Sequence, residues 1–305
     1  MDGVLVVDKP AGPTSHDIVD RARRALGTRR VGHTGTLDPF ATGVLPLCLG
    51  RATRLARFLT AGEKTYRATV RLGFATTTDD LTGEPLGEPR RIELTDESLR
   101  AALAGLTSRF DQVPPAFSAR QVDGRRLYEL ARRGEATARA ATPVEVQALD
   151  LLSRAGDTLE LEVRCSAGTY VRAIARDLGE RLGCGAHLVA LRRTRSGGFG
   201  LDQAVPGDSF ERARERVIPM AQLLPEWPAV KVGVEGRKRV GHGRELGAED
   251  VLLGFPLTAV ERVRVVDEDG ELLALAVPRG FESSGSELPR RPALHPDVVL
   301  LGPEN

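Results

Sequence analysis

Alternation of apolar and polar side chains predicts several strands in the first 200 residues of the chain. Residues 4–7 and 44–49 are short apolar runs, which are typical of buried strands. Residues 65–72 place Tyr, Ala, Val and Leu at every second position between Thr and Arg, as in a strand with one buried face. Residues 159–165 repeat this alternation, so we expect a sheet with at least four strands.

Helical spacing of apolar residues separates these strands. Thr14 or Ser15 can cap a helix, and apolar side chains then recur at helical spacing until Gly27. Further helices are predicted at residues 52–59, 95–106 and 170–182, a polar loop at 75–91 and another short segment at 187–194. Because strands and helices mix without strict alternation, we expect an α+β fold with a mixed, mainly antiparallel sheet flanked by helices.

A Pro-rich stretch at residues 224–228 marks a domain boundary. Beyond it, residues 262–266 and 272–277 flank Asp-Glu-Asp-Gly, which predicts a hairpin. From residue 279 the chain is rich in Ser, Pro and Gly. We therefore expect a large domain over residues 1–225, a small β-rich domain over 226–280 and a loose tail over 281–305.

The composition is typical of a folded globular protein. Hydrophobic residues make up 41% of the 305, and no apolar run approaches the length of a membrane span. Residues 1–10 contain two Asp and only a four-residue apolar run, so we expect no secretory signal, no membrane partner and a cytoplasmic location. The three Cys are far apart and the five His follow no metal-binding spacing, so we expect no metal.

Basic residues are distributed unevenly. The net charge is only +1, yet of 43 basic residues four are Lys and 39 are Arg. Arg has a planar set of donors that suits phosphate and stacks on bases, although a GC-rich genome also favours Arg. Clusters occur at residues 21–30, 120–133, 192–195 and 237–244. Such separate patches favour a folded RNA as partner, whereas any single cluster is equally compatible with a solvated helix face.

One carboxylate, Asp38, stands in a stretch rich in Gly and Pro. Residues 32–46 read Gly-His-Thr-Gly-Thr-Leu-Asp-Pro-Phe-Ala-Thr-Gly-Val-Leu-Pro. Pro stiffens the chain after Asp38, and Gly allows a sharp bend or close contact with a ligand. An ordinary turn is the simplest interpretation of this loop alone. A nucleotide-binding loop is excluded, because Gly-Lys is absent from the chain and the Gly spacing is not that of a dinucleotide site.

Several separated segments together resemble one family, the TruB-type tRNA pseudouridine synthases. They are Lys-Pro-Ala-Gly-Pro-Thr-Ser at residues 9–15, the Asp38 stretch, Lys-Thr-Tyr at 64–66 and Ser-Ala-Gly-Thr-Tyr-Val-Arg at 166–172. Residues 188–194 and 114–132 resemble further family segments. The resemblance covers residues 3 to about 200 in the family's order, and the ordered set is far more specific than any one segment.

The resemblance implies the pseudouridine synthase fold and a reaction that needs no cofactor. The enzyme would isomerise the uridine at position 55, in the T arm of tRNA, to pseudouridine, after flipping it out of the RNA. Asp38 would be the essential carboxylate, as nucleophile or base, and Arg172 its electrostatic partner. The other roles implied are Tyr66 in stacking and proton transfer, Tyr170 and Leu191 in the uracil pocket, His33 as filler of the vacated space, and Lys9 in substrate binding. Each side chain taken alone would pass for an ordinary structural residue.

The resemblance also has limits. Gln121 stands where many members carry Lys and Phe117 where Tyr is common, in a segment of about residues 110–140 that would grip RNA. Residues 230–277 resemble a small PUA-like RNA-binding domain only loosely. Two rival hypotheses stay open: an RNA-binding protein that refolds tRNA with incidental catalysis, and a guide-RNA-dependent synthase that works with partner proteins. We favour a stand-alone monomeric enzyme with tRNA as its partner and no obligate protein partner.

Overall fold

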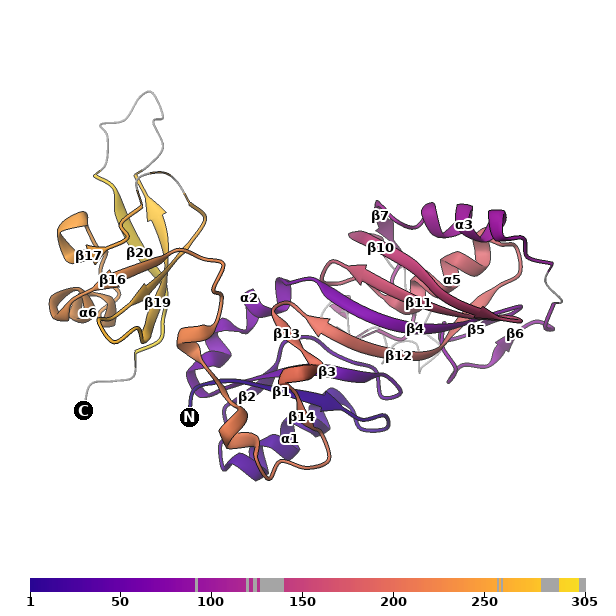
Figure 1. Cartoon of the computed structure of the whole chain (residues 1–305), viewed down its shortest axis with the longest axis horizontal. Coiled ribbons are helices and arrows are strands. Elements are labelled where there is room, and N and C mark those ends of the chain that lie inside the picture. The colour runs from indigo at the N-terminus through magenta and orange to yellow at the C-terminus, as the bar shows by residue number, and fades with distance from the viewer. Residues whose placement is uncertain are drawn as a thin grey trace.

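The computed structural model describes residues 1–90, 93–118, 121–122, 125–126, 140–256, 258, 260–280 and 291–301. These residues form a sheet of eleven strands, a sheet of five strands and two small hairpins. The five-stranded sheet lies to one side of the large one, next to the N-terminus and helix α2 (Ala56–Ala61) (Figure 1). The expected α+β fold with a β-rich C-terminal domain is thus confirmed.

The large sheet is mixed but mainly antiparallel. Its strand order is β14-β1-β3-β12-β4-β11-β10-β7, and β2, β13 and β15 pair beside this path. The parallel pairs are β1 with β14 and β3 with β12. The strands are β1 (Gly3–Lys9), β2 (Val31–His33), β3 (Thr42–Leu49), β4 (Lys64–Leu72), β7 (Arg109–Gln112), β10 (Thr142–Ala155), β11 (Thr158–Cys165), β12 (Ala186–Ser196), β13 (Phe199–Gly200), β14 (Val205–Pro206) and β15 (Ile218–Pro219).

Strand β12, expected only as a short segment, joins the two halves of this sheet. It pairs along its length with β4 but with β3 only through Arg192↔Thr42 and Arg193↔Gly43. A Cβ at Gly43 would lie 2.1 Å from the carbonyl oxygen of Arg193, and Gly43 has a φ of +103°. Glycine alone accepts both conditions without strain, so it fixes the close approach of β3 to β12.

Helices cover the large sheet where the apolar spacing predicts them. Helix α1 (Ser15–Leu26) begins with a capping box made by Thr14 and Asp17 and ends at Gly27 in the left-handed conformation. A 3-10 turn (Gly50–Leu55) leads into α2. Helices α3 (Asp96–Ala104) and α5 (Val171–Arg181) follow the predictions for 95–106 and 170–182 closely. The expected loop at 75–91 contains a small hairpin of β5 (Ala75–Thr76) and β6 (Pro85–Leu86).

The C-terminal sheet has the strand order β17-β16-β18-β19-β20. Its β18–β19 pair is the hairpin that the sequence predicts. Residues 293–299 correct the expected loose tail, because they form β20 along β19 and place alternate residues from Leu294 to Leu300 in the core. Residues 281–290 and 302–305 of that tail lie outside the described residues. The elements are β16 (Ala229–Val232), α6 (Val234–Gly241), β17 (Val251–Leu253), β18 (Val263–Val266), β19 (Leu272–Arg279) and β20 (Ala293–Val299).

The C-terminal sheet packs directly against the start of the large domain. One apolar cluster includes Val4 and Leu55 from the large domain and Leu275 and Leu300 from the small one. Polar contacts extend this interface, since Arg51 Nη1 donates to the carbonyl of Leu300 at 2.9 Å. The two domains therefore share a buried core near α2.

Much of the segment expected to grip RNA lies outside the described residues. Its described parts are β7, residues 113–118 and a hairpin of β8 (Gln121–Val122) with β9 (Arg125–Arg126). The basic cluster at residues 120–133 falls largely outside the described residues. Across the described ranges, no helix is both long and apolar enough to cross a bilayer.

Candidate active site

Four segments that are distant in the sequence supply most of the lining of one pocket of about 580 Å³, and Thr60 of α2 also contributes. The four segments are the loop between β2 and β3, the start of β4, the turn before α5, and the middle of β12. Six residues predicted for the site meet here: His33, Asp38, Tyr66, Tyr170, Arg172 and Leu191. This volume lies within the range of small-ligand sites and accommodates a nucleotide.

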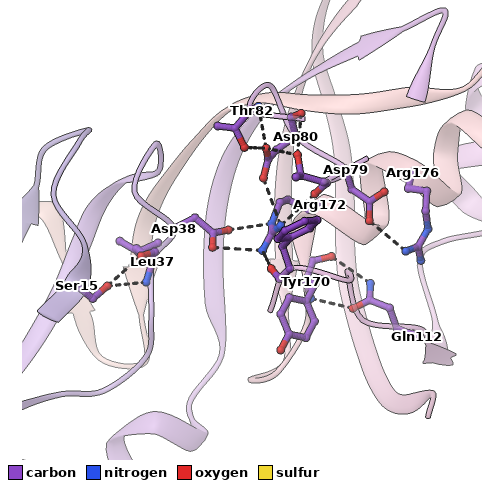
Figure 2. A network of polar contacts seen from close by, with 12 residues as sticks. Ser15, Leu37, Asp38, Asp79, Asp80, Thr82, Gln112, Tyr170, Arg172 and Arg176 are labelled. Carbon is purple, nitrogen blue, oxygen red and sulfur yellow. Dashed lines mark hydrogen bonds and ion pairs between the residues drawn. The ribbon is translucent and has the colours of Figure 1, made fainter. Parts of the chain in front are cut away.

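The Asp38 loop is held from behind by the Lys9–Ser15 segment. Lys9 is fully buried, and its ammonium donates to the carbonyls of Pro39 at 3.1 Å and Ala41 at 2.7 Å. Ser15 Oγ both accepts from the Leu37 amide at 2.8 Å and donates to the Leu37 carbonyl at 3.1 Å (Figure 2). These bonds bracket Asp38 on both sides and orient its carboxylate. Lys9 has no exposed surface and contacts the backbone of this loop, and its expected role in substrate binding stays a prediction.

Asp38 forms a two-pronged ion pair with Arg172 (Figure 2). Arg172 Nε lies 2.9 Å from Asp38 Oδ2, and Nη2 donates to Oδ1 at 3.3 Å. Arg172 is 5% exposed, whereas the Asp38 side chain keeps 34% of its surface open. Burial raises the pKa of the Asp38 carboxyl, and the positive charge of Arg172 opposes this. The pair thus holds the Asp38 carboxylate at the pocket surface in a fixed orientation.

Arg172 is itself fixed by groups that the sequence did not single out. Asp80, 4% exposed, lies with Oδ2 3.3 Å from Arg172 Nη1. Its other oxygen accepts from the Thr82 amide at 2.9 Å and from the Thr82 and Thr78 hydroxyls. Arg172 also donates to the carbonyls of Thr78 at 3.0 Å and Phe117 at 2.8 Å. The guanidinium therefore has one permitted orientation.

The bond to Phe117 uses its backbone, so replacement of the family's common Tyr by Phe leaves this contact intact. One helical turn further along α5, Arg176 Nη1 pairs with Asp79 Oδ2 at 3.2 Å (Figure 2). Asp79 has a φ of +61°, which is uncommon for a residue with a side chain. Arg172 and Arg176, one turn apart on the same face of α5, thus each form an ion pair with the turn at residues 79–80.

Aromatic and apolar side chains form the remaining walls. Tyr66 on β4 and Leu191 on β12 are each 8% exposed and contribute to the pocket lining. Tyr170 precedes α5, and the buried Gln112 holds its backbone: the Tyr170 amide donates to Gln112 Oε1 at 2.8 Å, and Gln112 Nε2 donates back at 3.2 Å. His33 is half-buried at the end of β2, where Nδ1 accepts from the Gly35 amide at 3.3 Å.

Two buried cations also line the pocket. Lys64 is 5% exposed and donates to the carbonyls of Thr60 and Gly62. Burial lowers its pKa to about 8. Arg193 is 1% exposed, so the third basic cluster predicted as a surface patch instead places one Arg inside the molecule. Its neighbour Arg192 faces away and pairs with Asp8 at 2.7 Å.

Comparison with protein-family models supports a single assignment. Residues 23–171 match the model described as "TruB family pseudouridylate synthase (N terminal domain)". Residues 172–223 match "tRNA pseudouridylate synthase B C-terminal domain". The two matches meet at Arg172 and span the complete pocket.

Known proteins give the same result. The chain is 45% identical over 281 residues to the tRNA pseudouridine synthase B of Solibacter usitatus, covering 90% of this chain and 95% of that one. It is 47% identical over 278 residues to that of Ralstonia nicotianae, with 88% and 87% covered. A solved structure described as "Crystal Structure of a Cbf5-Nop10-Gar1 Complex" superposes with a TM-score of 0.73 at 26% identity, over 98% of this chain and 85% of that one. The chain therefore belongs to the TruB family of pseudouridylate synthases.

Proposed function

We propose that this chain isomerises the uridine at position 55, in the T arm of tRNA, to pseudouridine, with Asp38 as the essential carboxylate. The observation that carries the proposal is the oriented Asp38–Arg172 pair, which lies with Tyr66 in one pocket. The relatives that are 45–47% identical bear the name tRNA pseudouridine synthase B. The reaction breaks the bond from ribose C1′ to uracil N1, rotates the base, joins C1′ to C5 and moves the C5 proton to N1.

Asp38 must be ionised for this chemistry. A carboxylate that attacks carbon or removes a ribose proton acts as an electron-pair donor in both cases. Burial works against the charge by raising the carboxyl pKa, and the positive charge of Arg172 opposes that increase. Arg172 is held in turn by Asp80 and by two carbonyls, so its position costs no reorganisation when the substrate enters.

The pocket walls suit a flipped pyrimidine. Tyr66 offers an aromatic face for stacking, and Leu191 and Tyr170 enclose the ring from β12 and from the start of α5. A uridine in a folded T arm must leave its stack, at a cost of a few kcal/mol. His33 lies on the pocket lining at the end of β2 and is the side chain we assign to fill the vacated space.

We further propose that the chain acts alone, as a monomer in the cytoplasm, with the C-terminal sheet as a second, PUA-like RNA-binding surface. The solved structural relatives are in complexes with other proteins. However, identity to them is 24–26%, well below the 45–47% to relatives named for tRNA. This difference favours tRNA as a directly recognised substrate.

The decisive experiment measures pseudouridine on an in vitro transcribed tRNA and on an isolated T-arm hairpin. We expect the purified wild-type chain to convert one T-arm uridine in both RNAs, and Asp38→Asn to bind tRNA without converting it. Conversion at a different uridine would refute the positional assignment. A folded, tRNA-binding wild type without activity would refute the stand-alone enzyme and favour a missing partner or an RNA-folding role.

A further inference from the structure

The buried Arg193 occupies an unusual place in the pocket wall. A side chain with 1% exposure is beyond the reach of bulk solvent, yet Arg193 carries a permanent charge. Its Nε donates to the Val44 carbonyl at 2.6 Å and its Nη2 to the Gly35 carbonyl at 3.1 Å. Gly35 belongs to the loop that carries Asp38, and Val44 belongs to β3. Arg193 thus ties that loop to the sheet.

Arg193 lies opposite Tyr66 in the sheet. Arg193 and Tyr66 are direct cross-strand partners in the antiparallel pairing of β12 with β4, so their side chains share one face of the sheet. Both residues line the same pocket, and the positive charge of Arg193 acts on the Tyr66 phenol. The relative placement of the two side chains is therefore fixed by strand register and by the two carbonyl bonds that hold Arg193.

The chemistry of the two groups sets the direction of a hydrogen bond between them. A guanidinium has donors and no acceptor, so the phenol oxygen can only accept from Arg193. The phenol proton is then left to point elsewhere, and the pocket is the open side. We propose that Arg193 is a positioning residue that holds the Tyr66 oxygen and directs the phenol proton toward the bound base. This inference deepens the proposed function and rests on Tyr66 acting there.

Electrostatics act in the same sense. Burial raises the pKa of the Tyr66 phenol, and the charge of Arg193 opposes that increase. The other groups that face Tyr66, Cys165 on β11 and the Asp38 carboxylate, raise the phenol pKa further. Arg193 therefore makes Tyr66 a better proton donor than its buried surroundings alone would allow.

A first test requires no RNA and so does not depend on the proposed function. A polyfluorinated tyrosine, whose phenol is more acidic than that of Tyr, is placed at position 66 and titrated by 19F NMR. We expect Arg193→Gln to lower the acid ionisation constant of this phenol by about tenfold or more, and Arg193→Lys to recover part of the loss. The matched control is Arg192→Gln, on the same strand but facing away. Equal constants in wild type and in folded Arg193→Gln would overturn the proposal.

A second test separates positioning from contact with the RNA. Arg193→Lys keeps the charge and should fold, but a single ammonium cannot serve both carbonyls and the phenol. In single-turnover assays at saturating tRNA we expect the Arg193→Lys variant to react about tenfold more slowly than wild type. When Arg193→Lys is added to Tyr66→Phe, we expect a further loss of less than about twofold, because the phenol is already absent. An equal loss in both backgrounds, or a weaker tRNA Kd with an unchanged rate, would instead make Arg193 a structural or phosphate-binding residue and refute the proposal.

Discussion

Replacing Asp80 by Asn changes a residue that does not itself line the pocket but contacts Arg172, which does. The side chain is 4% exposed and keeps its shape, and the remaining oxygen can still accept from Thr78 and Thr82. What is lost is the negative charge that faces Arg172 Nη1 at 3.3 Å, where an amide NH₂ would now meet another donor. Asp80→Asn therefore tests whether the ion pair of Asp80 with Arg172 affects the activity and the pKa of Asp38.

Two effects of opposite sign are expected. Loss of the Asp80–Arg172 ion pair displaces Arg172. A shift of about 1 Å in an active-site group can slow a reaction by up to a hundredfold. The Asp80 charge also raises the pKa of Asp38, so its removal lowers that pKa. The two carboxylates bind different nitrogens of one guanidinium, and at an effective dielectric constant of ~20 their repulsion is on the order of 2 kcal/mol. We halve this repulsion energy to about 1 kcal/mol, because a third of the Asp38 side chain is open to water. Its loss then makes the ratio of ionised to protonated Asp38 roughly fivefold larger at acid pH.

The assay is the single-turnover rate of pseudouridine formation from pH 4.5 to 8.5. The rate should rise with pH as Asp38 ionises, reach a plateau about ten- to a hundredfold below wild type, and reach it at lower pH than wild type. Urea unfolding should show a loss of about 2 kcal/mol, less than the cost of a fully broken buried pair because Arg172 keeps Asp38 and two carbonyls. A plateau equal to that of wild type, or one reached at higher pH, would refute the reasoning.

Two further changes probe the framework of the pocket. Burial lowers the pKa of Lys9 to about 8 from 10.5, so folding releases a proton between these pH values and stability rises there by up to about 3 kcal/mol. In Lys9→Met, the free energy of unfolding measured in urea should rise less from pH 7.5 to 9.5 than in wild type. An equal rise in both proteins would contradict the lowered pKa of Lys9. Gly43→Ala places its Cβ 2.1 Å from the Arg193 carbonyl oxygen and should lower the free energy of unfolding by over ~3 kcal/mol. The control Gly156→Ala, also at positive φ but in open space, should cost only about 1 kcal/mol by thermal melting, and equal losses would contradict the close-approach argument.

The pocket residues that could be predicted from the sequence are those that stand in recognisable motifs. Asp38, Tyr66 and Arg172 each stand in a short segment with a distinctive order, and all three line the pocket. Ser15 stands in one of the segments as well, yet nothing in the sequence says that its hydroxyl would meet Leu37. A motif can be recognised from order alone, whereas the contact it makes depends on how the elements pack.

The contact of Asp80 with Arg172 could not be predicted, because the sequence around Asp80 resembles any polar turn. Residues 76–83 read Thr-Thr-Thr-Asp-Asp-Leu-Thr-Gly, a composition that predicts a loop. The contact to Arg172 crosses 92 residues of sequence and depends on the placement of α5 against the β5–β6 hairpin. Arg193 was misassigned for a related reason, since strand periodicity distinguishes the two faces of β12 but not which face meets the pocket.

The C-terminal tail illustrates a different limit. Its composition is dominated by the Ser, Pro and Gly of residues 281–290, which argues for a loose segment. The alternation of Leu294, Pro296, Val298 and Leu300 that follows is a strand signal, but it is short and contains Pro. Pro is tolerated in β20 because this strand lies at the edge of its sheet.

The choice of partners for the buried cations has a consequence for RNA binding. Lys9, Lys64 and Arg193 are all buried beside or behind the pocket, and their hydrogen bonds go to backbone carbonyls. A carbonyl satisfies a donor without cancelling its charge, so the wall remains positive around Asp38. Carboxylate partners would have stabilised the same cations but opposed the approach of a phosphate backbone and raised the pKa of Asp38 further. Backbone carbonyls thus allow one site to attract a polyanion and still keep its own carboxylate ionised.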